Sequence, residues 1–423
     1  MKVLLITYYW PPAGGSGVQR WLKFVKYLPE FGIEPVVYTV KNPDYAIEDS
    51  SLLSEIPPSL EVLRGDIWEP NRILSKFSKS KKDNSSGFLN PNPTFIERQL
   101  QYIRANYFIP DARKFWIKPS VKQLSAYLEK NPVDVIITTG PPHSLHLIGL
   151  ELKARYGIKW LADFRDPWTN IDYFHSLPLT SSSRARHYEL ETKVLEKADA
   201  VLVVGKSMKD EFIERANKVQ VLTNGYDDFK QEGKIELDTK FSISHIGLMN
   251  ADRNPMVLWR ALTELVEESA EFEHDLQVNL IGKCAEEVYK AVADFNLEDK
   301  VDFVGYVGHN EVLAYQQASQ VLLLSVNKVA SAKSIVTGKI FEYLQSKRPI
   351  IGIGPVDGDL AEILEECEAG RMVDFEDMQS LKDVVTQHYK AYKAGKLVAD
   401  SQHVQQYHRR NLTAALAKLL EKI

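Results

Sequence analysis

Short apolar runs alternate with segments of helical periodicity along the whole chain. In the first half, runs typical of buried strands occur at residues 3–7, 35–38, 133–138, 159–162 and 200–204. Segments with apolar residues at helical spacing lie between them, at about 18–31, 144–156 and 183–197. A strand that is buried on both faces is a continuous apolar run, so this pattern predicts a parallel sheet covered by helices on both faces.

The second half repeats the alternation. Its apolar runs lie at residues 241–246, 276–281, 301–303, 321–325 and 350–353. Helical segments are predicted near 254–268, 285–295, 311–318, 338–346 and 360–366. The polar, charged stretch 225–240 separates the two sets of strands. We therefore predict an α/β protein of two Rossmann-like domains, residues 1–225 and 236–399.

Two regions break this alternation. Residues 75–93 are polar and rich in Lys, Ser and Asn, which predicts a mobile surface loop, with contact to an anionic membrane as the alternative. Residues 402–423 have helical periodicity, and Leu412, Leu416 and Leu419 or Leu420 share one face. Such a helix needs a partner surface.

Composition and charge narrow the class of protein. The 423 residues are 44% hydrophobic and 26% charged, which is ordinary for a globular protein, and the net charge of −5 argues against a nucleic-acid binder. Cys284 and Cys367 are far apart and indicate neither a disulfide framework nor a zinc site. The first apolar run is too short for a signal peptide, and no run reaches the roughly 20 residues that span a bilayer. We expect a cytoplasmic protein.

The segment Ser334–Gly352 carries candidate chemistry between two apolar runs. Thr337 and Gly338 stand where a helix would begin, and unpaired N–H groups at a helix start favour a phosphate. Lys339 adds a positive charge, and Glu342 follows one turn from Gly338, within reach of a ribose. The pattern predicts a nucleotide-diphosphate site, and a solvated helix face is the alternative.

A glycine-rich turn follows the first predicted strand. It contains Gly14, Gly15, Ser16 and Gly17, and glycines at a strand-to-helix turn let a ligand approach the backbone closely. The dinucleotide-binding spacing G-x-G-x-x-G is absent. We interpret the loop as a ligand loop, with a plain tight turn as the alternative.

A charged segment, Asp163-Phe-Arg165-Asp166, follows the run 159–162, at the edge where parallel sheets bind ligands. Asp166 can accept a hydrogen bond from a ligand hydroxyl, and Arg165 can orient Asp166 or bind an anion. For Asp163 a structural salt bridge is an equal alternative. His143 is predicted at the same edge, facing the ligand, whereas His146 is predicted to be a packing residue.

The order of these motifs resembles the retaining glycosyltransferases of family 4. The resemblance rests on the loop 14–17, the turn 222–227, His245-Ile-Gly247 followed by Arg253-Asn-Pro, the segment 301–312 and the segment 337–352. The family has the GT-B architecture, in which two Rossmann-like domains face each other across a deep cleft. The resemblance also implies that the C-terminal helix, about residues 400–423, packs on the N-terminal domain.

The resemblance implies donor-binding roles for eleven positions. Glu342 matches the glutamate that holds the donor ribose. Arg253 matches a basic residue that pairs with the donor diphosphate, and a solvent-facing position is the alternative. Gly305 and Tyr306 match the loop beside the nucleotide base. The full set is Gly15, Ser16, Gly17, Arg253, Gly305, Tyr306, Val336, Thr337, Gly338, Lys339 and Glu342.

Three positions depart from the family pattern. Ser334 stands where a glutamate usually contacts the transferred sugar, and Leu248 stands where many relatives have a second diphosphate-binding arginine. Arg165 lies at about the place of an active-site histidine. The segment around Arg165 resembles a subgroup that acts in bacterial surface-polysaccharide synthesis. The predicted catalytic set is therefore Asp163, Arg165, Asp166 and His143.

The implied activity is transfer of a sugar from a nucleotide-diphosphate sugar to an acceptor hydroxyl, with retention. The acceptor would be a glycan or a lipid-linked glycan, which allows peripheral contact with the inner face of the membrane. We expect no cofactor and no metal, since no aspartate pair supplies a convincing metal site, and the adjacent aspartates Asp227 and Asp228 fall in the predicted interdomain turn. The alternatives are a catalytically impaired nucleotide-sugar binding protein and a nucleotide-sugar 2-epimerase.

Overall fold

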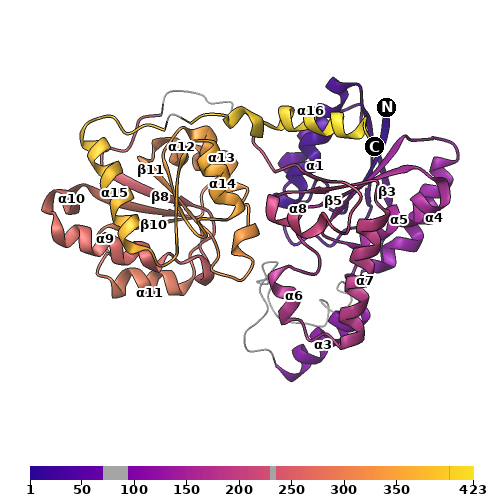
Figure 1. Cartoon of the computed structure of the whole chain (residues 1–423), viewed down its shortest axis with the longest axis horizontal. Helices are drawn as coiled ribbons and strands as arrows, with labels where there is room; N and C mark the ends of the chain where they lie inside the picture. Colours follow the sequence, from indigo (N-terminus) through magenta and orange to yellow (C-terminus); the bar gives the residue numbers. More distant parts are fainter. Residues whose placement is uncertain (70–93, 229–234, 400) are drawn as a thin grey trace. The chain divides into compact units, whose positions relative to one another are not determined.

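A computed structural model of the chain describes residues 1–69, 94–228, 235–399 and 401–423. It divides into unit 1, Met1–Asn224 with Arg409–Ile423, and unit 2, Gly225–His408. Figure 1 shows a central sheet with helices on both faces in each unit. The surface loop predicted at residues 75–93 lies outside the described residues.

Unit 1 is built on a parallel sheet of seven strands. In chain order these are β1 Lys2–Ile6, β2 Glu34–Val40, β3 Glu61–Gly65, β4 Val135–Gly140, β5 Lys159–Phe164, β6 Ala200–Val203 and β7 Val219–Val221. Their order across the sheet is β3-β2-β1-β4-β5-β6-β7. In register, Val3 of β1 lies opposite Pro35 of β2 and Val135 of β4.

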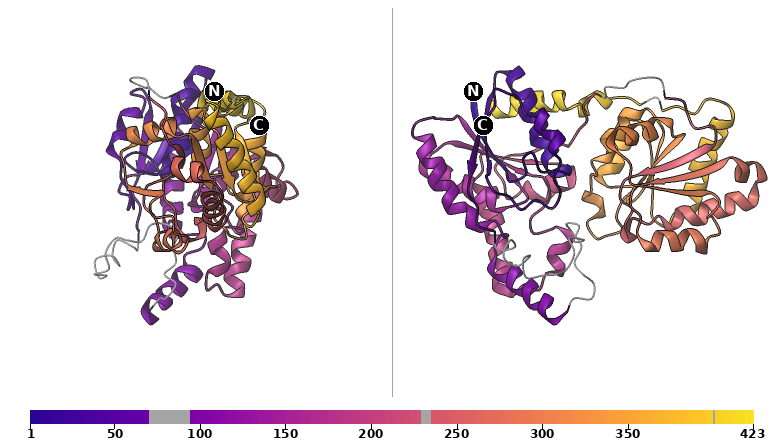
Figure 2. Two further views of the ribbon diagram at one scale, coloured as in Figure 1. Left: turned by 90° about the vertical axis from the view of Figure 1, so that its left-hand side faces the viewer. Right: turned by 180° about the vertical axis from the view of Figure 1, so that it is seen from behind.

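The helices of unit 1 connect these strands. They are α1 Ser16–Tyr27, α3 Phe95–Tyr107, α4 Lys114–Leu128, α5 Ser144–Tyr156, α6 Asp172–Ser176, α7 Ser181–Lys197, α8 Lys206–Phe212 and α16 Arg409–Leu420, with 3-10 turns η1 Leu28–Phe31 and η2 Ser50–Glu55. Both chain termini lie in this unit (Figure 2).

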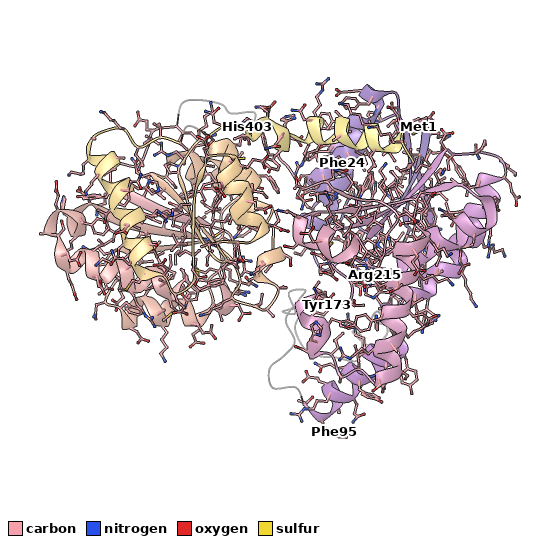
Figure 3. The ribbon with its side chains drawn as sticks, viewed as in Figure 1. Met1, Phe24, Phe95, Tyr173, Arg215 and His403 are labelled. Carbon is pink, nitrogen blue, oxygen red and sulfur yellow. The ribbon has the colours of Figure 1, made fainter. Side chains whose placement is uncertain are left out.

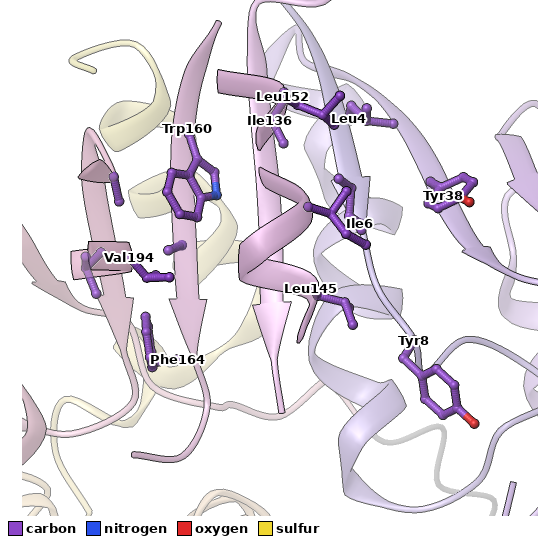
Figure 4. Close-up of a cluster of buried hydrophobic side chains, with 14 of the residues drawn as sticks. Leu4, Ile6, Tyr8, Tyr38, Ile136, Leu145, Leu152, Trp160, Phe164 and Val194 are labelled. Carbon is purple, nitrogen blue, oxygen red and sulfur yellow. The ribbon is translucent and has the colours of Figure 1, made fainter. Parts of the chain in front are cut away.

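Alternate residues of each strand enter two different cores. Leu4 and Ile6 of β1 belong to a cluster with Trp160 and with residues of α4, α5, α7 and α8, part of which is shown in Figure 4. Val3 and Leu5 belong to the cluster on the opposite face, which includes α1 and α16. Because side chains alternate across a strand, a continuous apolar run serves both faces.

The C-terminal helix begins later than predicted but buries the predicted face. Residues 404–407 form a 3-10 turn, η5 Val404–Tyr407, and α16 starts at Arg409. Leu412, Leu416 and Leu420 are 8%, 0% and 1% exposed and pack in the cluster with α1. The partner surface that its periodicity requires is therefore unit 1 itself.

Unit 2 contains a parallel sheet of six strands. These are β8 Phe241–Ile246, β9 Leu276–Ile281, β10 Val301–Gly305, β11 Val321–Ser325, β12 Ile350–Ile353 and β13 Gly370–Val373. Their order across the sheet is β10-β9-β8-β11-β12-β13. The connections are α9 Met256–Glu268, α10 Ala270–Asp275, α11 Glu286–Asp294, α12 His309–Ala318, α13 Lys339–Ser346, α14 Asp359–Glu366 and α15 Met378–Lys393, with 3-10 turns η3 Ala251–Arg253 and η4 Ala332–Ser334.

Each sheet has one point at which the strand order reverses. In unit 1 the chain runs outward from β1 to β3 and then returns to add β4 on the other side of β1. In unit 2 the same reversal lies between β8 and β11. In each unit, the loops after the two strands at the reversal leave the sheet in opposite directions. Such sheets bind ligands in the crevice that this creates at the carboxyl ends of the strands.

None of the helices in the described ranges has the length and apolar character needed to cross a membrane.

The buried face of α16 gives a direct test of the unit 1 core. Leu416→Ala should lower the free energy of unfolding by about 2–5 kcal/mol, because it leaves a cavity between α16 and α1. The matched change Lys418→Ala, on the exposed side of the same helix, should alter it by less than about 0.5 kcal/mol. Urea unfolding monitored by tryptophan fluorescence measures both, and equal effects would contradict this packing.

Candidate functional site

A cluster of charged and polar side chains lies at the point of reversal in unit 2. We call it the donor cluster and define it as His245, Arg253, Lys339, Glu342 and Tyr343. His245 is on β8, and Arg253 ends η3 after that strand. The other three residues are on α13, which follows β11. The topology thus brings together two segments about 90 residues apart in sequence.

The backbone of Arg253 is held from both sides. Asn250 Oδ1 accepts a hydrogen bond from Arg253 N at 3.0 Å, and Ser325 Oγ donates to Arg253 O at 2.8 Å. The guanidinium Nη1 donates to Leu248 O at 2.8 Å, whereas no described residue accepts a bond from Nε. The guanidinium of Arg253 is poorly solvated, and this burial lowers its pKa.

Lys339 is a second cation beside Arg253. Its Nζ lies 3.3 Å from His245 Nε2, while His245 Nδ1 lies 3.2 Å from Leu323 O. A carbonyl oxygen can only accept, so we assign the proton of His245 to Nδ1 and the free lone pair to Nε2. Burial and the positive charge of Arg253 lower the pKa of Lys339 to about 7.

Gly247 makes room for this lysine. Its φ is +118°, and a Cβ added to it would lie 2.6 Å from Lys339 Nζ. Any side chain at this position would therefore displace the ammonium group as well as strain the backbone.

Glu342 and Tyr343 are fixed by neighbouring elements. The buried Gln316 of α12 donates from Nε2 to Glu342 Oε2 at 3.1 Å. Ile246 N donates to the hydroxyl of Tyr343 at 2.9 Å, which ties the end of β8 to α13. Glu342 itself is half-buried.

The backbone before α13 offers unpaired donors to the same place. No described residue accepts a hydrogen bond from the backbone N–H groups of Val336, Thr337 or Gly338. These groups precede the positive end of the α13 dipole. Ser334, at the head of the predicted motif, donates from Oγ to Ser331 O at 2.9 Å.

The remaining predicted donor residues lie elsewhere. Gly305 has a φ of +78° and ends β10, and Tyr306 follows it and is 92% exposed. Both lie at the carboxyl end of β10, which is two strands from β8 in the unit 2 sheet. Gly15 and Gly17, with Ser16 between them, are in unit 1 at the start of α1. Gly15 has a φ of +82°, which explains why glycine is needed there.

Asp163 in unit 1 is an internal anion. It is fully buried, and it accepts hydrogen bonds from Arg20 Nη2 at 2.9 Å, Trp21 Nε1 at 2.6 Å and Thr139 Oγ1 at 2.8 Å. Burial alone would raise its pKa, but the charge of Arg20 and these bonds lower it. The alternative of a structural salt bridge therefore fits Asp163 better than contact with a substrate.

Arg165 joins the loops that follow three strands. Its Nη1 donates to Gly17 O at 2.8 Å, and its Nη2 donates to Pro141 O. The guanidinium carbon lies 5.7 Å from the centroid of the Tyr9 ring. A Cβ added to Gly17 would lie 3.0 Å from Nη1, so the glycine loop and Arg165 are closely fitted.

Asp166 is the exposed carboxylate of this segment. Desolvation by the surrounding protein raises its pKa, although the positive charge of Arg165 opposes that shift. Of the two carboxylates predicted at this edge, Asp166 is the one that a ligand can reach.

The two histidines before and within α5 are both buried. His146 is 2.9 Å from Thr138 Oγ1 and stacks on Phe164, as expected for a packing residue. His143 is only 7% exposed and stacks on Trp168 with a centroid distance of 4.9 Å. Burial lowers the pKa of both rings, so both are neutral near pH 7. The contact of His143 with an acceptor stays a prediction, and the burial of the His143 ring argues against it.

Three residues that shape these sites were not predicted from the sequence. Gln316, Tyr343 and Arg20 position Glu342, α13 and Asp163, respectively. Nothing in their sequence neighbourhood distinguishes them from packing or surface residues. In the described parts of the chain, no group of three or more His, Cys, Asp or Glu side chains is arranged to hold a metal ion.

The two aspartates of the charged segment should respond differently to neutralisation. Asp163→Asn leaves Arg20 buried without its counter-charge and should cost about 3–5 kcal/mol of stability. Asp166→Asn removes an exposed charge and should cost less than about 1 kcal/mol. Thermal and urea unfolding measure both. A mild effect of Asp163→Asn would show that the ion pair does not hold this edge together.

Comparison with known protein families gives one match in each half of the chain. A model described as Glycosyltransferase Family 4 matches residues 87–228, and a model described as Glycosyl transferases group 1 matches residues 240–390. No curated protein matches the sequence.

Solved structures with the same fold cover the whole chain. Sucrose-phosphate synthase from Thermosynechococcus elongatus has a TM-score of 0.61 at 16% identity, over 100% of this chain and 98% of that one. The lipopolysaccharide outer core galactosyltransferase WaaB, in its apo form, has a TM-score of 0.57 at 13% identity, over 100% of both chains. UDP-GlcNAc 2-epimerase from Methanocaldococcus jannaschii has a TM-score of 0.52 at 12% identity, again over 100% of both.

At these identities the solved structures establish the fold, and the family models establish the class of activity. The predicted GT-B fold is confirmed by the two parallel α/β units and by these structural relatives. The chain is therefore a glycosyltransferase with the GT-B fold.

Proposed function

We propose that the chain transfers a sugar from a nucleotide-diphosphate sugar to an acceptor hydroxyl with retention of configuration, in surface polysaccharide or glycoconjugate synthesis. The observation that carries the proposal is the pair of cations in the donor cluster. Among the described residues, neither Arg253 nor Lys339 has an ion-pair partner, and the free amides of residues 336–338 adjoin α13 in the same unit. A diphosphate supplies the charge that this arrangement lacks.

The chemistry of transfer follows from where charge develops. The bond between the sugar C1 and the diphosphate oxygen breaks, and its electron pair stays on the diphosphate. Arg253, protonated Lys339 and the amides before α13 stabilise that charge. Because these groups already supply positive charge, we propose that transfer is metal-independent, and activity in the presence of a chelator tests this.

Glu342 and Asp166 are assigned the two other substrate contacts. Glu342 is held by Gln316 and, in our proposal, accepts hydrogen bonds from the donor ribose. Asp166 is proposed to accept the hydrogen bond of the acceptor hydroxyl and then its proton, as the hydroxyl oxygen forms the new bond to C1. Arg165 and Asp163 are positioning residues that hold the loops around Asp166.

Nucleotide binding to unit 2 is the first test. We expect one or more of UDP, GDP, ADP, CMP and dTDP to raise the thermal midpoint of the full chain. Arg253→Ala should weaken that binding by about 10–100-fold, since it removes a charge-assisted contact. Glu342→Ala should weaken binding of ribonucleotides.

Matched controls lie at the opposite edge and on a neighbouring helix. Arg371→Ala, at the amino end of β13, and Glu365→Ala, on the exposed face of α14, should leave nucleotide affinity unchanged. If Arg253→Ala and Glu342→Ala bind as tightly as these controls, the site assignment is wrong. If nucleotide binds but no donor yields transfer or hydrolysis, the chain is the impaired binding protein that Ser334 suggests.

Binding should also depend on pH through Lys339. The pKa of Lys339 is about 7 in the free protein, so below pH 7 most molecules carry the protonated lysine that binds the diphosphate. This form is lost as the pH rises above 7. Affinity for an intact nucleotide sugar, whose diphosphate does not titrate in this range, should fall by up to about 100-fold from pH 6 to 9. Isothermal titration calorimetry measures this, and Lys339→Arg, which stays charged, should abolish the dependence. An unchanged pH profile in Lys339→Arg would exclude Lys339 from the site.

A further inference from the structure

Tyr173 is an exposed aromatic side chain that follows Asp166 closely in the sequence of unit 1. It lies on the short helix α6, its side chain is labelled in Figure 3, and it is 43% exposed. No described residue forms a hydrogen bond with the Tyr173 hydroxyl, and no described aromatic ring packs against the Tyr173 ring. The ring and the hydroxyl are therefore both available to a ligand.

The next residue along the chain, Phe174, anchors α6. It is 2% exposed, and its ring packs edge to face on His187 of α7 at a centroid distance of 5.2 Å. The guanidinium of Arg184, also on α7, lies over the same ring at 5.4 Å. Consecutive side chains of a helix point about 100° apart, so burying Phe174 against α7 leaves Tyr173 on the open side. The short helix thus holds an exposed ring in a fixed place.

The electrostatic surroundings of Tyr173 place it at the sheet edge that carries Asp166. Desolvation raises the pKa of Tyr173 to about 12, and the negative charges of Asp166 and Asp111 contribute to the rise. The positive charge of Arg104 opposes it, whereas the phenol of Tyr9 acts in the same direction as the carboxylates. Such effects fall off with distance, so Tyr173 lies close to both Asp166 and Tyr9.

Tyr9, which follows β1, supplies a second aromatic ring at this edge. It stacks on Tyr45 with ring centroids 6.2 Å apart, and the hydroxyl of Tyr45 donates a hydrogen bond to Tyr8 O at 2.8 Å. These contacts fix the Tyr9 ring, which is half-buried. No described residue forms a hydrogen bond with the Tyr9 hydroxyl. We call Tyr9, Asp166 and Tyr173 the tyrosine subsite.

We propose that the tyrosine subsite binds the ring of an uncharged acceptor sugar. One face of a pyranose consists of C–H groups, whose apolar area and partial positive charge fit the negative face of an aromatic ring. Tyr173 supplies that ring, and hydroxyl groups at the edge of the sugar bind to Asp166 and to the free hydroxyl of Tyr9. The inference rests on the proposed function, in which Asp166 contacts the acceptor hydroxyl, and it specifies which acceptor the site takes.

The charges around the tyrosine subsite disfavour an anionic acceptor. Asp166 is itself negative and exposed, and the guanidinium of Arg165 already donates hydrogen bonds to two backbone carbonyl groups. The phenol on α6 is affected more by the carboxylates of Asp166 and Asp111 than by the guanidinium of Arg104. A phosphate group would therefore be repelled by Asp166. An uncharged sugar needs no counter-charge, and its hydroxyl groups donate strong hydrogen bonds to a carboxylate.

Saturation-transfer NMR with the full chain tests the tyrosine subsite. The probes are the methyl pyranosides of glucose, galactose, mannose and N-acetylglucosamine at millimolar concentration, with glycerol 3-phosphate as the anionic probe. At least one pyranoside should bind, with the strongest saturation on the C–H groups of one ring face. Tyr173→Leu should weaken that binding by about three- to tenfold because it removes the stacking contact, whereas Tyr173→Phe, which keeps the ring, should retain it within about twofold.

Tyr156→Leu is the matched control. Tyr156 is 37% exposed in unit 1, but it ends α5, which runs from the carboxyl end of β4 to the amino end of β5. It therefore lies at the edge of the sheet opposite Asp166, and its replacement should leave pyranoside binding unchanged. Nucleotide-induced thermal stabilisation of Tyr173→Leu should equal that of the unaltered chain, which shows that the variant is folded.

Three results would overturn the inference. These are no binding of any pyranoside to the unaltered chain, equal pyranoside binding by Tyr173→Leu, and tighter binding of glycerol 3-phosphate than of every pyranoside. Nucleotide binding without pyranoside binding contradicts this inference alone. Pyranoside binding that Tyr173→Leu weakens, without binding of any nucleotide, contradicts the proposed function alone.

Discussion

The functional account depends on two cations held side by side, neither of which forms an ion pair with a carboxylate of the described residues. Burial lowers the pKa of both Arg253 and Lys339, and the positive charge of Arg253 lowers the pKa of Lys339 further. A fold keeps such a pair only when its backbone is strongly fixed. Asn250 and Ser325 hold Arg253, and the neutral ring of His245 receives Lys339. The unpaired amides before α13 add to the positive potential, so the site is organised for an anion before any ligand arrives.

Unit 1 has the same reversal of strand order, but its buried charge is neutralised within the protein. Its buried Asp163 is neutralised within the protein by Arg20, Trp21 and Thr139, so it stabilises the sheet edge instead of attracting a ligand. Arg165, two residues further along the chain, donates hydrogen bonds to two carbonyl groups and ties three loops together. Unit 2 thus leaves positive charge available at its point of strand reversal. In unit 1 the charge of Asp163 is satisfied internally, and Asp166 is the exposed carboxylate of the segment after β5. That difference is the physical basis for assigning the donor to unit 2 and the acceptor to unit 1.

The sequence predicted the parts of the fold that are buried on both sides. Central strands such as β1 and β11 are continuous apolar runs and were recognised, whereas the edge strand β3 and the short β7 are half-exposed and were missed. Helix α3 was also missed, because it follows the polar sequence 75–93 and many of its apolar side chains are exposed. At the site, Glu342 was predicted through a motif, but Gln316 was not. A hydrogen bond across 26 residues of sequence leaves no local pattern.

The most direct test of the central claim is the proton balance of nucleotide-sugar binding. Calorimetric titration at pH 8 in two buffers of different ionisation enthalpy measures how many protons the complex takes up. If the diphosphate docks against Lys339, binding should be accompanied by net uptake approaching about one proton per nucleotide, and Lys339→Arg should reduce that uptake to near zero. Binding without proton uptake, or the same uptake in Lys339→Arg, would contradict the assignment of this cation pair to the donor diphosphate.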